Sequence, residues 1–249
     1  MQNGHFVLVV SGLAFEARIA VNIEGTRTCF GQAPLILQAL GASITPECCG
    51  ILSFGLVGAL DPKLRAGSLV VATEILGADG RFPTDVQWTQ NLMQVFPQAL
   101  HATIYGTDRL HADAATKHRS FGSSGAAVVD MESHVAARFA AEKNLPFAAL
   151  RVVADTACRS VSQSALAGLC LDGRIDRLAV LRGVLRRPRD AFNLAALACD
   201  ALLARVALMK VQRQLGGWLE GSGFAHPRAA AAVAVYDPAP ADNPAMSWR

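Results

Sequence analysis

The stretch VVDMESHVAARFAAEKNLPFAALRVVADTA, residues 128–157, decides the fold. Two short apolar runs flank a segment of helical spacing over 132–143. Apolar runs of this length are typical of buried strands, and a helix between two of them predicts a βαβ unit. A carboxylate stands at the end of each run, Glu132 at the first and Asp155 at the second. Because such sheets bind ligands beyond the carboxyl ends of their strands, we expect a site at these acids.

The same pattern extends toward the N-terminus, where a third acid, Glu16, follows the first apolar run. The sequence predicts an α/β fold with a central, mostly parallel or mixed twisted sheet flanked by helices, and a helical C-terminal segment. The predicted strands cover 5–10, 49–55, 68–76, 102–106, 126–131 and 147–155, and the predicted helices include 34–40 and 85–96.

The composition suits a globular α/β protein. The chain has 249 residues, of which 52% are apolar and only 17% charged, which argues against disorder and against a nucleic-acid binder. We predict one domain over 1–221 and a disordered Ala/Pro-rich tail over 222–249. The six cysteines show no zinc spacing and most have apolar neighbours, so we expect buried free thiols in a reducing compartment and no metal. With neither a basic leader nor a long apolar stretch, the protein is expected to be cytoplasmic.

Positive charge gathers near the C-terminus. Residues 174–213 hold nine Lys/Arg and three Asp, a net charge of +6 in a chain of net +3. We expect a basic helical segment over 174–215. Two interpretations remain open: a solvated basic face on packing helices, or peripheral contact with the anionic inner face of a membrane.

Each acid also has a structural explanation. Asp155 could cap the turn or helix that follows its strand. Glu132 could interact with a helix macrodipole, a contribution of about 0.3–1 kcal/mol. Glu16 could be a solvated residue of a helix start, and His134 is interpreted as structural. A protein that only binds a ligand has no use for all three acids together, so the set favours acid–base catalysis.

Several motifs resemble a known superfamily. VVDMES followed by ALRVVADTA resembles the nucleoside phosphorylases and nucleosidases, which include the methylthioadenosine/S-adenosylhomocysteine nucleosidases. GLAFEARIA and SFGLVGALDPKLRAGSLVVATEI fall in the matching order, so the resemblance spans roughly residues 5–157. With GVLRRPRDAFNLAALACDAL added, the chain is similar to the hopanoid-associated phosphorylase subfamily, implicated in removing adenine from adenosylhopane during bacterial hopanoid synthesis.

This resemblance implies roles for the acids. Asp155 takes the place of the acid that protonates purine N7, and Glu132 that of the carboxylate that binds the ribose hydroxyls. Glu16 takes the place of the base that activates water. The chemistry accepts these roles, because cleavage of an N-glycosidic bond needs one acid for the base and one carboxylate for water. No metal or organic cofactor is implied.

The resemblance also implies contacts to the nucleoside. Met131 would pack on the sugar, and the backbone around Val57 and Gly58 would line the nucleoside. The backbone of Leu110 would read the adenine edge. Arg109 stands where nucleosidases often carry an aromatic residue, and its guanidinium plane could stack on a base.

The nucleophile is inferred from a departure in the glycine loop. Leu56 occupies the position at which phosphorylases carry a hydroxyl residue for phosphate, so with Glu16 present water is the expected nucleophile. Ala59 replaces a common second glycine. The leading prediction is therefore an N-ribosyl hydrolase acting on adenosylhopane. The alternatives are a phosphate-dependent phosphorylase, a methylthioadenosine/S-adenosylhomocysteine- or futalosine-type nucleosidase, a nucleoside-binding protein and a membrane scaffold. A homo-oligomer is expected by resemblance.

Overall fold

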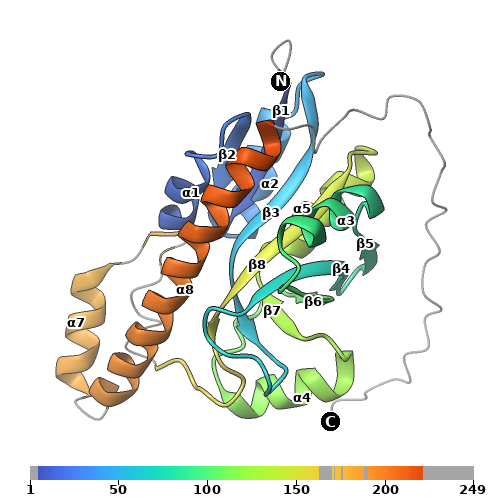
Figure 1. The fold of residues 1–249 in the computed structure, drawn as a ribbon. Helices are drawn as coiled ribbons and strands as arrows, with labels where there is room; N and C mark the ends of the chain where they lie inside the picture. Colours follow the sequence, from blue (N-terminus) through green and yellow to red (C-terminus); the bar gives the residue numbers. More distant parts are fainter. Residues whose placement is uncertain (1–4, 163–169, 171, 175, 188–189, 221–249) are drawn as a thin grey trace, which may run out of the picture.

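The computed structural model describes all residues except 1–4, 163–169, 171, 175, 188–189 and 221–249. The described elements alternate between strands and helices along most of the chain (Figure 1). In chain order they are β1 (Phe6–Ser11), α1 (Ala14–Ala20), β2 (Thr26–Phe30), α2 (Ala33–Ser43), β3 (Cys48–Ala59), β4 (Leu69–Gly77), β5 (Gly80–Pro83), α3 (Val86–Val95), β6 (Leu100–Gly106), α4 (Ala114–Ser124), β7 (Val128–Asp130), α5 (Ser133–Glu142), β8 (Phe147–Asp155), α7 (Arg177–Arg186) and α8 (Asp190–Glu220).

The strands form one mixed sheet that closes on itself around β3. β3 pairs with β1 and β8 in parallel and with β7 antiparallel. β8 pairs with β4, β4 with β6 and β6 with β7, so five strands make a closed ring. β2 and β5 lie at the two ends of the strand order. The long strand β3 therefore joins the open part of the sheet to the ring.

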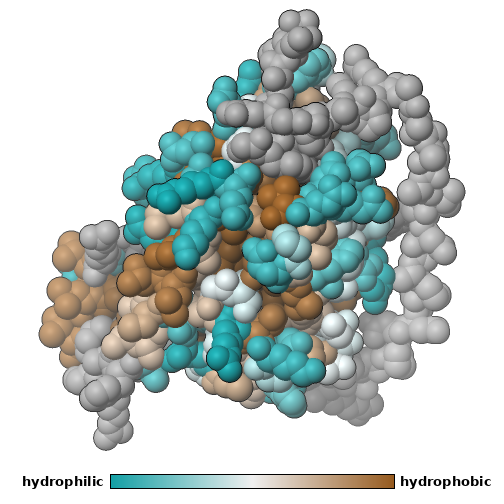
Figure 2. Space-filling view, in the orientation of Figure 1, coloured by the Kyte–Doolittle hydropathy of each residue, from teal (hydrophilic) through white to brown (hydrophobic). Residues whose placement is uncertain are grey.

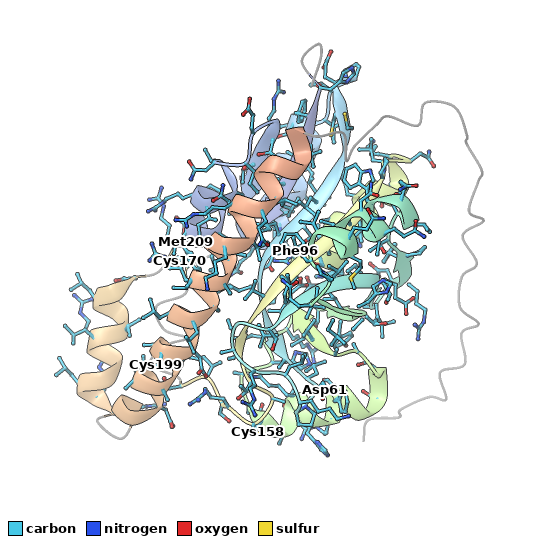
Figure 3. The ribbon with its side chains drawn as sticks, in the orientation of Figure 1. Asp61, Phe96, Cys158, Cys170, Cys199 and Met209 are labelled. Atoms are coloured by element: carbon cyan, nitrogen blue, oxygen red, sulfur yellow. The ribbon has the colours of Figure 1, made fainter. Side chains whose placement is uncertain are left out.

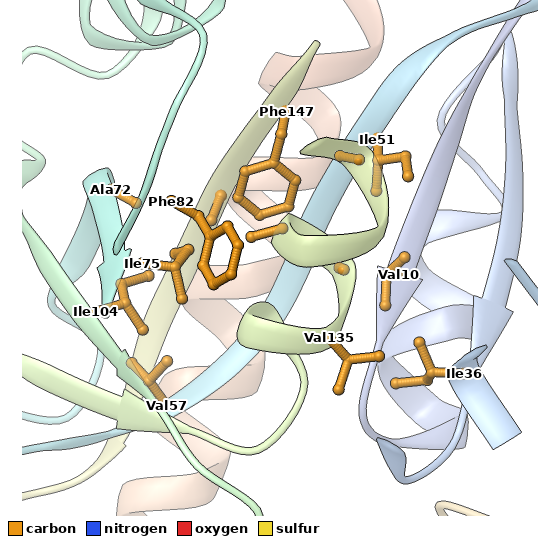
Figure 4. Close-up of a cluster of buried hydrophobic side chains, with 14 of the residues drawn as sticks. Val10, Ile36, Ile51, Val57, Ala72, Ile75, Phe82, Ile104, Val135 and Phe147 are labelled. Atoms are coloured by element: carbon orange, nitrogen blue, oxygen red, sulfur yellow. The ribbon is translucent and has the colours of Figure 1, made fainter. Parts of the chain in front are cut away.

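Two apolar cores cover the two faces of this sheet. Alternation along β1 sends Phe6, Leu8 and Val10 into one core, and Val7 and Val9 into the other. The first core packs the sheet against α2 and α5 (Figure 4), and the second packs it against α1, α3 and α8. β1 and most of β3 are thus buried on both sides, which explains why these two strands read as continuous apolar runs.

The predicted fold class is confirmed, with differences in detail. The predicted helix over 132–143 is α5, and the strands around it are β7 and β8. The predicted parallel βαβ unit was wrong, because β7 runs antiparallel to β3 while β8 runs parallel to it. β2 and β5 were not predicted, since both lie at the ends of the strand order and carry polar or exposed residues. The C-terminal helical segment is present as α7 and α8, and α8 packs along β8 (Figure 1). The proposed tail over 222–249 lies outside the described residues.

The cysteines depart in part from the prediction. None of the six is in a disulfide, and Cys29, Cys48 and Cys49 are buried. Cys158, on the loop after β8, and Cys199, on α8, are exposed (Figure 3), so the expectation of buried thiols was wrong for these two. Within the described part of the chain, no helix is long and apolar enough to cross a membrane.

Candidate active site

The three predicted acids gather along the C-terminal half of β3. The backbone N–H of Leu56 donates to Glu16, at 2.8 Å, and Gly58 lies opposite Asp155 in the β3–β8 pairing. Two residues of strand separate these points, about 7 Å of backbone. Glycine makes both approaches possible, because a methyl group at Gly55 would lie 2.6 Å from Glu16 Oε2 and one at Gly58 would lie 3.3 Å from Asp155 Oδ1.

Glu16 is a buried carboxylate that accepts three backbone hydrogen bonds. Its Oε2 accepts from the N–H groups of Gly12 and Leu13, at 3.0 and 2.9 Å, and its Oε1 accepts from Leu56. The carboxylate therefore does bind backbone N–H groups at the start of α1, as the structural explanation assumed. It is not solvated, however, since only 2% of the residue is exposed. Burial raises the pKa of Glu16, while Arg151 and these N–H groups oppose the rise. A carboxylate has about four lone-pair sites, so one remains for a further donor.

Glu132 is the residue before α5, but its side chain does not cap that helix. The carboxylate instead lies against Gly12, where a methyl group would come within 2.5 Å of Oε1, and its Oε2 lies 3.8 Å from Nη2 of Arg151. Burial raises the pKa of Glu132 to about 8, with the Asp130 carboxylate adding to the rise and Arg151 opposing it. Glu132 stands at the N-cap position, so an interaction with the macrodipole stays a prediction, while the contacts with Gly12 and Arg151 set where its carboxylate lies.

A fully buried arginine, which sequence reasoning missed, lies between these acids. Arg151 Nη2 contacts Oδ2 of Asp130 at 2.9 Å and donates to the hydroxyls of Ser53 and Ser133 at 2.6 and 3.1 Å. Nη1 and Nε have no hydrogen-bond partner among the described residues, although they are buried. A methyl group at Gly55 would lie 2.8 Å from Nη1, so this group shares the surroundings of Glu16. The missed signal was a charge inside the apolar run FAALRVVAD, which must find a partner when buried.

Asp155 is held by a second buried cation that the sequence did not indicate. Lys117, on α4, is only 1% exposed, and its ammonium group contacts Oδ2 of Asp155. It also donates to the carbonyls of Thr156 and Arg159, at 3.1 and 2.9 Å. An ammonium group has three donors, so these contacts occupy Lys117 fully and leave Oδ1 of Asp155 unengaged by it. Burial raises the pKa of Asp155, and Lys117 opposes the rise.

A polar hollow adjoins this end of the site. It has a volume of about 400 Å³ and is lined by residues of the loop after β8 and by one residue of α8: Thr156, Cys158, Arg159, Ser160 and Asn193. Arg159 Nε lies 2.6 Å from Oδ2 of Asp200, an ion pair that fastens this loop to α8. Asp155 therefore lies at the border between the buried strand and a space open to polar molecules.

The remaining predicted residues lie in different surroundings. Met131 is half-buried between Asp130 and Glu132, and Val57 is buried in the first core, so that only its backbone could line a ligand. Arg109 and Leu110 lie on the exposed loop after β6. Among the described residues, no hydrogen bond or ion pair joins Arg109 or Leu110 to the three acids. The contact of Arg109 and Leu110 with a purine base therefore stays a prediction.

Chemically, the site offers two acid groups at one end and one at the other. Glu16 and Glu132 flank Arg151, and Asp155 with Lys117 stands two residues further along β3. His134, by contrast, packs its Cβ against Gly106 and contacts Asp108 at 3.1 Å, in keeping with a structural role. In the part of the chain described, no group of three or more His, Cys, Asp or Glu side chains could hold a metal ion.

The fold is that of known nucleosidases. Similar solved structures include a futalosine hydrolase of Helicobacter pylori (TM-score 0.60, 11% identity, covering 87% of this chain and 96% of that one). They also include an H. pylori MTAN variant with 5′-methylthioadenosine in its active site (TM-score 0.62, 12% identity, 88% and 100%). A third is the 5′-methylthioadenosine/S-adenosyl homocysteine nucleosidase of Campylobacter jejuni (TM-score 0.58, 13% identity, 86% and 99%). At these identities the likeness shows the fold alone.

The sequence itself matches one family. No curated protein sequence matches this chain. Residues 47–169 match the family model of the phosphorylase superfamily. This segment runs from the start of β3 past the end of β8 and contains Glu132, Arg151 and Asp155, while Glu16 precedes it. The family match and the fold agree: residues 47–169, just under half of this chain, are similar to the phosphorylase superfamily, and they lie in a nucleosidase-type fold.

Proposed function

We propose that the protein is an N-ribosyl hydrolase that cleaves the glycosidic bond of a purine nucleoside. The observation that carries the proposal is the division of acids along β3, with Glu16 and Glu132 around Arg151 at one point and Asp155 two residues away. Hydrolysis of a glycosidic bond needs an acid on the leaving group and a carboxylate for water, spaced so that sugar and water fit between them.

In the proposed reaction Asp155 protonates the leaving base. Its Oδ2 is engaged by Lys117, so Oδ1, which lies over Gly58, is the oxygen that carries the proton. Burial favours the protonated form, since it raises the pKa of this carboxyl group. Lys117 has no donor left for the substrate and acts as a positioning residue. General acid catalysis of this kind contributes about 10²–10⁴ in rate.

Water is activated at the opposite end. Glu16 keeps one acceptor site beyond its three backbone donors, and the buried Nη1 of Arg151 lies on the same glycine. A water molecule that donates to Glu16 and accepts from Nη1 satisfies both groups. The carboxyl group of Glu132 would accept hydrogen bonds from the ribose hydroxyls. These hydrogen bonds would strengthen as positive charge develops on the sugar.

The proposed substrate is adenosylhopane, cleaved to release adenine in hopanoid synthesis. Support comes from the sequence motifs that resemble the hopanoid-associated subfamily, including the Arg-rich segment after β8. A protonated aspartate also suits a 6-amino purine, because it donates to N7 while its other oxygen accepts from the amino group. In this chain Lys117 competes for that second oxygen. A methylthioadenosine/S-adenosylhomocysteine- or futalosine-type nucleosidase is therefore kept as the alternative substrate class.

Phosphorolysis is the second candidate for the nucleophile. Leu56 presents an apolar side chain and gives its backbone N–H to Glu16, which supports water. Arg151, however, is a buried cation with an unpartnered Nη1, and such a group also suits an anion. The two nucleophiles predict opposite phosphate dependence.

The test is adenine release from adenosylhopane in detergent, from methylthioadenosine and from futalosine-type nucleosides, with and without phosphate. Hydrolysis predicts full release without phosphate, and the second product is the 5′-substituted ribose with a free 1-hydroxyl instead of its 1-phosphate. Release only with phosphate would establish a phosphorylase. Failure with all substrates, combined with retained nucleoside binding, would overturn the enzyme proposal and leave a binding protein.

A further inference from the structure

α7 presents a stripe of leucines to its surroundings. Leu178, Leu181 and Leu185 follow the spacing i, i+3, i+7, which places them on one face of the helix. They are 62%, 55% and 72% exposed. A soluble monomer exposes single large apolar side chains routinely, but a contiguous stripe marks a surface that contacts something else.

α8 adds to this apolar surface. Leu202, Leu203 and Val206 are 62%, 57% and 39% exposed. Of the thirteen large apolar side chains exposed in the described part of the chain, six thus belong to α7 and α8. In Figure 2 hydrophobic surface gathers over α7 and the adjoining part of α8, whereas hydrophilic surface covers much of the rest of this view.

Positive charge borders the stripe. Arg182 lies one turn after Leu178, and Arg186 lies one turn after Arg182, so the two line one edge of the leucine face. Both are exposed, and neither forms an ion pair with a carboxylate of the described residues. Residues 174–189 contain six Arg and one Asp, a net charge of +5 in a chain of net +3. Long arginine side chains at such an edge can extend their charge past the apolar face.

We propose that α7, with the exposed face of α8, docks on the surface of an anionic lipid bilayer. Apolar side chains flanked by arginines are the combination that such a surface binds, the leucines entering the headgroup boundary and the arginines meeting the lipid charge. A second copy of the chain fits less well, because a two-fold contact through α7 would bring two segments of net charge +5 together. This proposal stands apart from the reaction and uses none of the residues assigned to it.

The docking face connects closely with the site. α7 begins four residues after Gly173, whose carbonyl accepts the backbone N–H of Ala14 at 2.9 Å. A methyl group at Gly173 would lie 2.4 Å from the carbonyl oxygen of Gly12, in the loop whose N–H group donates to Glu16. A docked α7 would therefore hold this loop of the site near the lipid surface.

Vesicle cosedimentation tests the proposal. Wild-type protein is mixed with vesicles of phosphatidylcholine alone or with phosphatidylglycerol added, at low and high salt. Binding is expected only with the anionic lipid and should fall as salt rises. Arg182→Gln together with Arg186→Gln should weaken binding about 25-fold, at about fivefold for each arginine. Leu178→Gln, Leu181→Gln and Leu185→Gln together should weaken it at least about tenfold.

The control variant carries Leu35→Gln and Leu37→Gln on α2, two leucines that are 41% and 42% exposed away from α7. It should bind vesicles like wild type. All variants should keep the wild-type melting temperature and turnover of a soluble nucleoside, so failure of the reaction is separable from failure of docking. Equal binding to both vesicle types, or loss of binding in the control, would overturn the proposal. The proposal would also be overturned if the wild-type protein were a dimer that does not bind vesicles and that dissociates when the three α7 leucines are replaced.

Discussion

Replacing Lys117 with methionine removes the positive charge behind Asp155 and keeps a side chain of similar length. The two groups are in contact and nearly buried, with 1% and 15% of their side chains exposed. Two unit charges 4 Å apart interact by about 4 kcal/mol at an effective dielectric constant of 20, the equivalent of about three pH units. Loss of the ammonium group therefore raises the pKa of Asp155 further. We expect a rise of about one to three pH units.

The assay is the pH profile of kcat/KM for adenine release. The proposed acid must be protonated, so activity falls as pH rises through the pKa of Asp155, and this basic limb should move to higher pH in Lys117→Met. Arg119→Met is the matched control. Arg119 is an exposed cation on the same helix, and its guanidinium group donates to the hydroxyl of Thr116 instead of contacting Asp155. The control should leave the basic limb in place.

The result that would refute this reasoning is a folded Lys117→Met protein whose basic limb does not move, or moves to lower pH. Circular dichroism and the melting temperature establish folding. If the methionine variant does not fold, Lys117→Arg keeps the charge and should keep the wild-type limb with reduced kcat. A shifted limb in that variant would equally contradict the role assigned to the charge.

Three further predictions concern the other groups of the site. Asp155→Asn should lower kcat for adenine release at least about 100-fold with a near-native melting temperature, and substantial residual turnover would exclude Asp155 as the acid. The raised pKa of Glu132 means that the folded protein holds a proton which the unfolded chain releases near pH 4.5, so wild-type stability falls as pH rises from there to about 8. Glu132→Gln lacks this dependence, and its melting temperature relative to wild type should rise between pH 5 and 8. Gly12→Ala would place a methyl group 2.5 Å from Glu132 Oε1 and should lower kcat/KM about 100-fold, whereas Gly41→Ala, where a methyl group meets nothing within 4 Å, should leave it unchanged.

The sequence predicted those parts of the fold that depend on local pattern. Buried strands read as apolar runs because both faces of the sheet are covered, and α5 shows helical spacing between two such runs. The antiparallel pairings could not be predicted in this way. β7 has only three residues, and its direction against β3 depends on closure of the ring by β4, β6 and β8, a contact between segments far apart in the sequence.

The site was predictable to the extent that its residues lie at strand ends. Glu16 and Asp155 follow β1 and β8, which both run parallel to β3, so their carboxyl ends meet as the sequence argument assumed. Glu132 follows β7, which runs antiparallel to β3, so that argument named the residue but does not explain its place in the site. The two buried cations were missed for different reasons. Arg151 left a signal, a charge within a buried strand, that was not used. Lys117 left none, because it is the one buried residue of α4 and lies 38 residues before Asp155, so only the fold brings the two side chains together.

A register shift in the pairing of β3 with β8 sets the position of Asp155 relative to the rest of the site. Val57 of β3 pairs with Val153 of β8, but the next residue, Gly58, pairs with Asp155 and passes over Ala154. Bulges of this kind re-aim a side chain at the point where the pairing is interrupted. Without it, Ala154 would stand opposite Gly58, and the carboxyl group would move one place further along. The glycine matters for the same reason, since a methyl group there would lie 3.3 Å from Oδ1 of Asp155. The position of the proposed acid thus depends on two features together. The bulge places Asp155 opposite Gly58, and the glycine leaves room for its carboxyl group.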